Sequence, residues 1–238
     1  MKIDILAIVA HPDDAELACS GTLLAHAALG KKIGIVDLTR GELGTRGTPE
    51  IRKQEAAASA AILQLDVREN LGLPDGFFEN TKEYQLEVIR AIRKYQPEIV
   101  LTNAITDRHC DHGRAAQLVR DSCFLSGLAK VETVDNGISQ SAWRPKVVYH
   151  VIQDTYIEPD IIVDITPYWD KKEASIKAFG TQFFNPSSSE PITHISKPEF
   201  LDFQKARAIE FGHRIGVLYG EGFTTHRTPG VANLFDLK

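Results

Sequence analysis

The sequence predicts an α/β domain, with a Rossmann-like, mostly parallel sheet covered by helices on both faces. Apolar runs alternate with helical segments through the first two-thirds of the 238 residues, which is typical of parallel sheets that are buried on both sides. Two of the runs end in polar clusters, at residues 10–14 and 108–112, and ligands in such sheets bind at the carboxyl ends of the strands. The length fits a single domain spanning 1–238, and no linker or internal repeat interrupts it.

Each expected element rests on its hydrophobic pattern and on the residues that punctuate it. Gly30 follows the first helix, Pro49 suits the first position of the second, and Pro97 follows the third. The expected strands are 2–9, 32–38, 67–71, 98–102, 147–152 and 161–165. The expected helices are 14–29, 49–65, 82–95, 112–125, 167–179 and 198–215.

Three segments are expected to be irregular. The Gly- and Thr-rich loop 39–48 is longer than a simple connecting turn needs to be, which favours a functional role. Residues 181–198 are rich in Ser and Pro and are interpreted as a surface insertion or lid. The tail from Tyr219 is Gly-rich, and we expect it to be packed rather than regular.

Composition excludes several classes of partner. The chain is 43% hydrophobic and 25% charged, with a formal net charge of -5 and a pI of about 5.9, so no basic field predicts binding to nucleic acid or to a membrane surface. The three cysteines form no C-x-x-C pair, which argues against a disulfide framework. No apolar run has the length of a membrane span and the N-terminus lacks a signal peptide pattern, so a cytoplasmic location is expected.

The two polar clusters together indicate a metal site. His11 and Asp14 lie in one strand-to-helix turn, and His112 begins a helix after another strand. These are ligand types that Zn²⁺ prefers, and a catalytic zinc takes three protein ligands, although Fe²⁺ also accepts them. Asp13 remains free as a base. Helix capping would explain one of the two aspartates, but it does not explain both of them and the second cluster.

These motifs resemble the LmbE-like (PIG-L-like) zinc de-N-acetylases, and the resemblance extends over nearly the whole chain. The residues that carry it are His11-Pro12-Asp13-Asp14, His109-Cys110-Asp111-His112, Thr39-Arg40-Gly41-Glu42, the helix with Arg52 and Glu55, and Tyr219-Gly220-Glu221-Gly222-Phe223. The resemblance implies that the chain deacetylates an N-acetylglucosaminyl small molecule. The loop 41–48 suggests the branch that acts on N-acetylglucosaminyl malate in bacillithiol biosynthesis.

The resemblance also implies roles for individual residues. It makes His11, Asp14 and His112 the metal ligands, Asp13 the general base, His109 the group that stabilises the oxyanion or protonates the leaving amine, and Asp111 the residue that orients His109. A neighbouring carboxylate such as Asp111 is the usual means of raising the pKa of a histidine.

Three further residues of the loop and the following helix are candidates for substrate binding. Arg52 is placed to meet sugar hydroxyls or a carboxylate, and Arg46 to meet the malate carboxylates by paired hydrogen bonds. Ordinary surface charge is the alternative for both arginines. Glu42 is a candidate hydrogen-bond acceptor that would hold the loop in place.

Other functions share parts of this pattern. A de-N-acetylase of another N-acetylglucosamine compound or an amidase of thiol conjugates would use the same metal site. A nucleotide-binding module would require G-x-G-x-x-G after the first strand, where residues 11–14 stand instead. A structural zinc site would close all four ligand positions, which the free Asp13 argues against. The family resemblance also implies a homo-oligomer, such as a hexamer.

Overall fold

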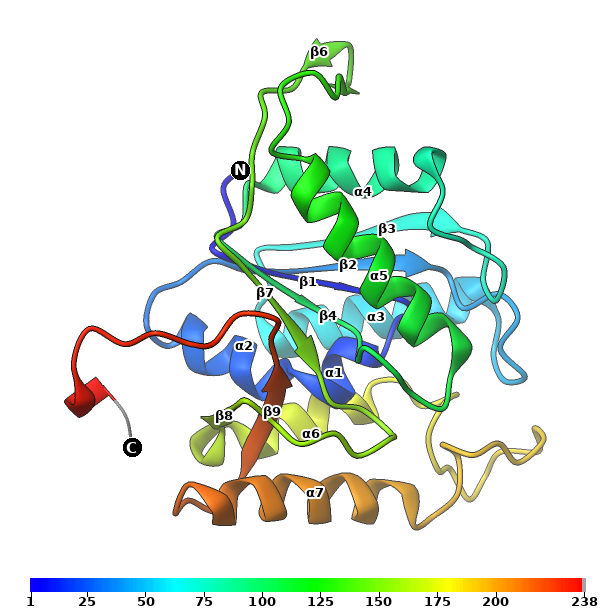
Figure 1. The fold of residues 1–238 in the computed structure, drawn as a ribbon. Coiled ribbons are helices and arrows are strands. Elements are labelled where there is room, and N and C mark those ends of the chain that lie inside the picture. Colours follow the sequence, from blue (N-terminus) through cyan, green and yellow to red (C-terminus); the bar gives the residue numbers. More distant parts are fainter. Residues whose placement is uncertain (237–238) are drawn as a thin grey trace.

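The computed structural model describes residues 1–236 and contains one large sheet and one small hairpin (Figure 1). The strands are β1 Ile5–Val9, β2 Ile33–Thr39, β3 Val67–Leu73, β4 Ile99–Thr102, β5 Val134–Asp135, β6 Ile138–Ser139, β7 Val147–Val151, β8 Ile161–Asp164 and β9 Gly220–Thr224. The large sheet has the order β3-β2-β1-β4-β7-β9-β8. The strands from β3 to β7 in this order are parallel, so the mostly parallel α/β fold is confirmed.

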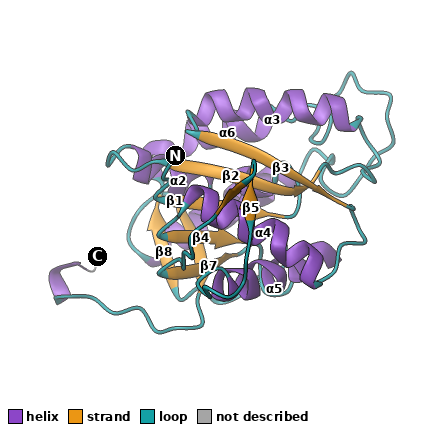
Figure 2. Ribbon diagram, turned by 90° about the horizontal axis from the view of Figure 1, so that it is seen from above, coloured by secondary structure: helices purple, strands orange, loops and turns teal. Residues whose placement is uncertain are grey.

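Helices cover both faces of the sheet, as Figure 2 shows from above. They are α1 Asp14–Ala18, α2 Ser20–Ala27, α3 Pro49–Leu63, α4 Lys82–Tyr95, α5 Cys110–Leu125, α6 Trp169–Lys177 and α7 Phe200–Arg214, with 3₁₀ turns at Thr166–Tyr168 and Leu234–Asp236. Successive residues of β1 point to opposite faces. Leu6 and Ile8 join the core under α4 and α5, whereas Ala7 and Val9 join the core under α1 and α2. Both faces of β1 are therefore apolar, as in other buried parallel strands.

The register of the central strands sets the position of the site. Ile8 of β1 lies opposite Val36 of β2 and Thr102 of β4, so the three strands end at the same edge. The chain leaves β1 toward β2 on one side, and β4 lies on the other, which makes this edge the switch point of the sheet. There the backbone N–H of Ala10 donates to Oδ1 of Asn103 at 2.8 Å, joining the loops that follow β1 and β4.

The first expected helix, 14–29, is divided in two, which corrects the prediction. The chain breaks at Cys19, whose φ of -145° is not helical, and a second helix begins at Ser20. The carboxylate of Glu221 accepts the N–H groups of Gly21 and Thr22 at 3.0 and 2.6 Å, and so caps the first turn of α2. A helix N-terminus has unpaired N–H groups that such an acceptor satisfies.

The C-terminal region is also more regular than expected. Residues 220–224, predicted to be packed without regular structure, form β9, which pairs antiparallel with both β7 and β8. The helix expected at 112–125 begins two residues earlier, at Cys110, with His109 as its N-cap. The β5–β6 hairpin was not predicted, although its turn residues Asn136 and Gly137 both have positive φ, as two-residue hairpin turns require.

No helix in the described part of the chain combines the length and the apolar character that crossing a membrane would need.

Candidate metal centre

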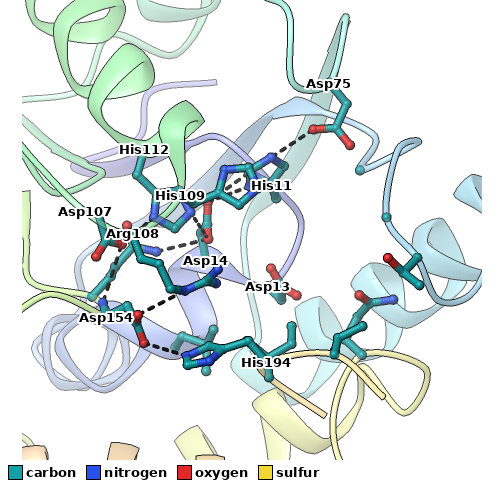
Figure 3. A pocket seen from close by; sticks show the side chains of 18 of the residues that line it. His11, Asp13, Asp14, Asp75, Asp107, Arg108, His109, His112, Asp154 and His194 are labelled. Carbon is teal, nitrogen blue, oxygen red and sulfur yellow. Dashed lines mark hydrogen bonds and ion pairs between the residues drawn. The ribbon is translucent and has the colours of Figure 1, made fainter. Parts of the chain in front are cut away.

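A pocket of about 480 Å³ opens at the carboxyl ends of β1, β4 and β7 (Figure 3). Both polar clusters of the sequence line it, together with Gly41, Leu43, Gly44 and Thr45 from the Gly-rich loop. The opposite wall includes residues 193–195 and Gln182, which belong to the expected lid segment. This segment contains no helix or strand between α6 and α7, and part of it borders the pocket.

Asp14 lies at the centre of the site, between two imidazole rings. Its Oδ1 is 3.1 Å from Nε2 of His112, and its Oδ2 is 3.5 Å from Nδ1 of His11. The side-chain amides of Asn103 and Gln153 each donate to this carboxylate at 3.0 Å, from the loops after β4 and β7. The carboxylate is therefore fixed by two neutral donors while it faces two histidines.

Each of these two rings is held on its far nitrogen by another carboxylate. Nδ1 of His112 lies 2.5 Å from Oδ2 of Asp107. Nε2 of His11 lies 3.0 Å from Asp75 and 3.3 Å from Asp111. Histidines that bind metals typically have one nitrogen on the metal and the other on a carboxylate or carbonyl. The nitrogens that face Asp14 are thus in the position of metal ligands.

The charges around the rings favour a cation at this position. Burial alone would lower the pKa of His11, but the carboxylates of Asp111, Asp14 and Asp75 raise it well above the usual range. Burial also opposes protonation of His112, and Asp14 and Asp107 overcome it and raise its pKa to about 9. Both rings are therefore stabilised in the protonated, positive form, and a divalent ion would bring the same charge to the same place.

The donor set fits a transition metal. One nitrogen from each of His11, His109 and His112 lies within 4.8 Å of the others, so three imidazoles gather at one place. With the carboxylate of Asp14 in contact with two of them, the site offers the imidazole and carboxylate donors that zinc and iron accept.

Asp13 lies beside this centre in an unusual backbone conformation. Its φ of 116° is positive, which costs energy for a residue with a side chain and is found preferentially at functional sites. Burial raises the pKa of its carboxyl to about 6, although the guanidinium of Arg52 opposes the increase. Nη2 of Arg52 donates to Oδ2 of Asp13 at 2.6 Å. The result is a buried carboxylate that titrates near neutrality.

The hydrogen bond between His109 and Asp111 uses the backbone of Asp111 and not its carboxylate. The backbone N–H of Asp111 donates to Nδ1 of His109 at 3.3 Å. The side chain of Asp111 instead contacts His11, and it accepts the N–H of Gly76 at 2.8 Å. The pKa of His109 is lowered, because its ring is partly buried and lies beside two positive histidines, so the expected increase is not found.

Arg46 and Glu42 both hold loops. Nε of Arg46 donates to the carbonyl of Thr181 at 2.6 Å and Nη1 donates to that of Pro191 at 3.3 Å, which ties the Gly-rich loop to the lid segment. The side chain is buried and is absent from the pocket lining. Glu42 accepts the N–H of Asp75 at 3.0 Å, so it pins the loop as anticipated. Arg52 does line the pocket.

Several site residues were missed in the sequence. Asn103 and Gln153 lie one and two residues after the ends of β4 and β7, so the same rule about strand ends that identified His11 could have found them. Asp107 lies just before the second cluster. Asp75 comes from a Pro-Asp-Gly turn far along the chain, and no signal in the sequence connects it to His11.

The chain is similar to known proteins whose names give two different activities. The family model described as PIG-L, GlcNAc-PI de-N-acetylase, matches residues 6–123, a range that contains both clusters. A 4-oxalmesaconate hydratase from Pseudomonas putida is 27% identical over 193 residues, which cover 74% of this chain and 73% of that protein. A diacetylchitobiose deacetylase from Thermococcus kodakarensis is 25% identical over 239 residues, covering 95% of this chain and 84% of the relative.

The fold has a close counterpart among solved structures. A conserved protein from Thermus thermophilus superposes with a TM-score of 0.87 at 33% identity, and the match covers 98% of each chain. The whole described architecture, and not only the residues around the clusters, is therefore shared.

Proposed function

The chain belongs to the PIG-L (GlcNAc-PI de-N-acetylase) family, and on that premise we propose that it is a metal-dependent hydrolase that removes the acetyl group from an N-acetylglucosaminyl small molecule. The observation that carries the proposal is the arrangement around Asp14. Two imidazoles face its carboxylate, a further carboxylate holds each ring from behind, and Asp13 lies beside them with one oxygen paired to Arg52.

We assign the metal to His11, Asp14 and His112, with zinc as the ion. When bound, a divalent metal supplies Lewis acidity, which polarises an acetamide carbonyl and makes water easier to deprotonate. The carboxylates of Asp75 and Asp107 keep the two rings oriented and make their free nitrogens more basic.

Asp13 acts in this proposal as the general base toward the attacking water. A base works best when its pKa lies near the working pH, and that of Asp13 is about 6. Arg52 holds the carboxylate by one oxygen, which leaves the other oxygen to accept the proton. Once protonated, Asp13 is also the proton source for the departing amine.

His109 stabilises the oxyanion as a neutral donor. Because its Nδ1 accepts the N–H of Asp111, the proton of the neutral ring belongs on Nε2. A donor aimed at developing charge is typically worth roughly a hundred- to a thousand-fold in rate. Asp111 therefore positions His109 through its backbone and His11 through its carboxylate.

For the substrate we propose N-acetylglucosaminyl malate. The proposal is supported by the Gly-rich loop 41–48, whose residues form part of the pocket wall. Other N-acetylglucosamine compounds and acylated thiol conjugates remain alternatives at the same site.

The test is release of a primary amine by the zinc-loaded protein. N-acetylglucosaminyl malate, free N-acetylglucosamine and a thiol conjugate are offered in parallel, and acetate is measured as the second product. We expect amine and acetate in equal amounts, and the fastest release from the malate glycoside. Absence of amine from every substrate would contradict deacetylation.

A second reaction is included because one relative is named a hydratase. The protein is incubated with an unsaturated dicarboxylic acid, and loss of the double-bond absorbance is followed. Hydration without amine release would replace the deacetylase proposal.

A further inference from the structure

Arg108 extends a largely unused guanidinium into the pocket. Its Nε donates to Oδ2 of Asp154 at 3.0 Å. Within residues 1–236 neither of its terminal nitrogens has a hydrogen-bond partner, and its side chain is 46% exposed. Figure 3 shows the guanidinium between the metal-site histidines and His194 of the lid segment. The two terminal nitrogens lie in one plane, and a carboxylate can accept a hydrogen bond from each of them.

The other arginines near the site are buried or have partners for their guanidinium groups. Arg52, which also lines the pocket, is buried and donates to Asp13 through Nη2, while its Nε is buried without a hydrogen-bond partner. Arg46 is buried outside the pocket lining and holds the lid carbonyls. Arg114 donates to Asp111 and to the carbonyl of Gly76. Arg108 is therefore the exposed guanidinium that can donate two hydrogen bonds to a ligand in the pocket.

Both oxygens of each carboxylate next to Arg108 already have a partner, which weakens their repulsion of an incoming anion. Asp107 contacts Nδ1 of His112 and accepts the N–H of Thr155 at 2.6 Å. Asp154 contacts Arg108 through one oxygen and Nε2 of His194 through the other, at 3.1 Å. Each negative charge is thus offset by donors that are already in place.

We propose that Arg108 binds a carboxylate on the substituent attached to the sugar, and that the enzyme selects acidic N-acetylhexosaminides over neutral ones. The inference rests on the proposed function and extends it to a residue that determines specificity. Asp154 is a positioning residue in this arrangement, because it fixes Arg108 from one side and the lid residue His194 from the other.

The experiment compares the activity of the wild type and its variants on two substrates. N-acetylglucosaminyl malate and the neutral methyl glycoside of N-acetylglucosamine are assayed with wild type, Arg108→Gln and Arg120→Gln. Arg120 is the matched control, since it has a similar exposure of 43% and pairs with Asp121 away from the pocket. The acid-to-neutral ratio of kcat/KM is expected to fall about 10- to 100-fold in Arg108→Gln, mainly through KM, because charged hydrogen bonds are worth that much.

The control is expected to keep the wild-type ratio. Arg108→Lys retains the positive charge but lacks the paired planar N–H donors of the guanidinium. Its acid-to-neutral ratio of kcat/KM should therefore lie between those of wild type and Arg108→Gln. An equal loss on both substrates in Arg108→Gln would overturn the inference, since Arg108 would then serve the reaction and not the selection.

Binding of malate itself separates this inference from the proposed function. Calorimetric titration is expected to show malate binding to the wild type and a loss of at least 10-fold in Arg108→Gln. If no substrate releases amine but this difference is seen, the deacetylase proposal fails and the anion site stands. Equal binding to both proteins, or none to the wild type, overturns the anion site.

Discussion

Asp13 combines three properties that a single buried carboxylate rarely has. Its backbone is held at positive φ, its pKa is raised to about 6 by burial, and Arg52 pairs with one of its oxygens. Strain of this kind persists only where the surrounding structure imposes it. The surrounding structure therefore imposes this conformation on the residue that we propose as the general base.

Substitution Asp13→Asn should separate metal binding from catalysis. The amide keeps the shape of the side chain but cannot accept a proton as a base, so kcat is expected to fall by about 10²- to 10⁴-fold. Zinc content measured by atomic absorption should equal that of the wild type. Activity within a few-fold of wild type would show that another group is the base.

The pH dependence of kcat/KM should report the pairing of Asp13 with Arg52. Asp13 must be deprotonated to act as a base, so activity is expected to rise with pH through an acid limb near 6. Arg52 lowers this pKa, so its loss in Arg52→Gln should raise it and move the limb to higher pH. The variant should then lose more activity at pH 6 than at pH 8. A profile that keeps its wild-type midpoint would argue against this electrostatic coupling.

The predicted site residues that lie next to strand ends are the ones that the structure brings together. His11, Asp14, His109 and His112 were found in this way, and the pocket brings them together. The contact from Asp75 to His11 joins residues 64 positions apart, and only the folded chain reveals it. The direction of the Asp111 side chain also depends on this turn, because its carboxylate accepts the N–H of Gly76 and contacts His11.

At the scale of elements, one buried ion pair connects four elements of the fold. Nζ of Lys172 in α6 lies 2.7 Å from Oε1 of Glu221 in β9, and the same carboxylate caps α2. Lys172 also donates to the carbonyls of Glu16 and Leu17 at the end of α1. The break between α1 and α2 is thus stabilised from two sides.

Removing one member of this pair should be costly. In Lys172→Met the charge of Glu221 stays buried without its partner, and we expect a loss of about 3–5 kcal/mol in the free energy of unfolding. Lys177→Met, on the same helix, breaks an exposed pair with Glu173 and should cost less than about 1 kcal/mol. Urea denaturation measures both, and similar values for the two variants would count against the structural role of the buried pair.

The elements that sequence patterns predicted well are those with strong local signals. The helix expected at 82–95 has those bounds in the structure, with Thr81 as its N-cap. The strand β9 was missed because Gly220 and Gly222 weaken any strand pattern. These glycines are required by tertiary packing: a Cβ at Gly220 would lie 2.7 Å from Ile162, and one at Gly222 would lie 2.8 Å from Phe211.

For the whole molecule, the metal should act as a cross-link between separate loops. Its proposed ligands come from the loop after β1 and from the start of α5. Zinc at 100 to 1,000 times its Kd would stabilise the fold by about 2.7–4.1 kcal/mol, which corresponds to a rise of about 5–16 °C in Tm for a chain of this size.

Calorimetric scans with zinc and with a chelator measure this rise. His112→Ala should abolish it, whereas His213→Ala, at an exposed position of α7, should retain it. An undiminished rise in His112→Ala would exclude His112 as a ligand.

The global architecture was predictable because a parallel α/β sheet is encoded by alternation of strands and helices along the chain. This alternation of strands and helices does not encode the antiparallel insertion of β9 between β7 and β8. The expected homo-oligomer stays a prediction for the same reason, since no local pattern in the sequence specifies a contact between copies.

That insertion has a consequence for biosynthesis. β8 reaches its place in the sheet only through β9, which is made roughly sixty residues later. At the usual 5–20 residues per second, a ribosome needs about 3–12 s to synthesise this stretch. During this interval β7 presents an open edge and β8 has no partner in the sheet, so the nascent chain is exposed to wrong strand pairing and to chaperones until β9 emerges.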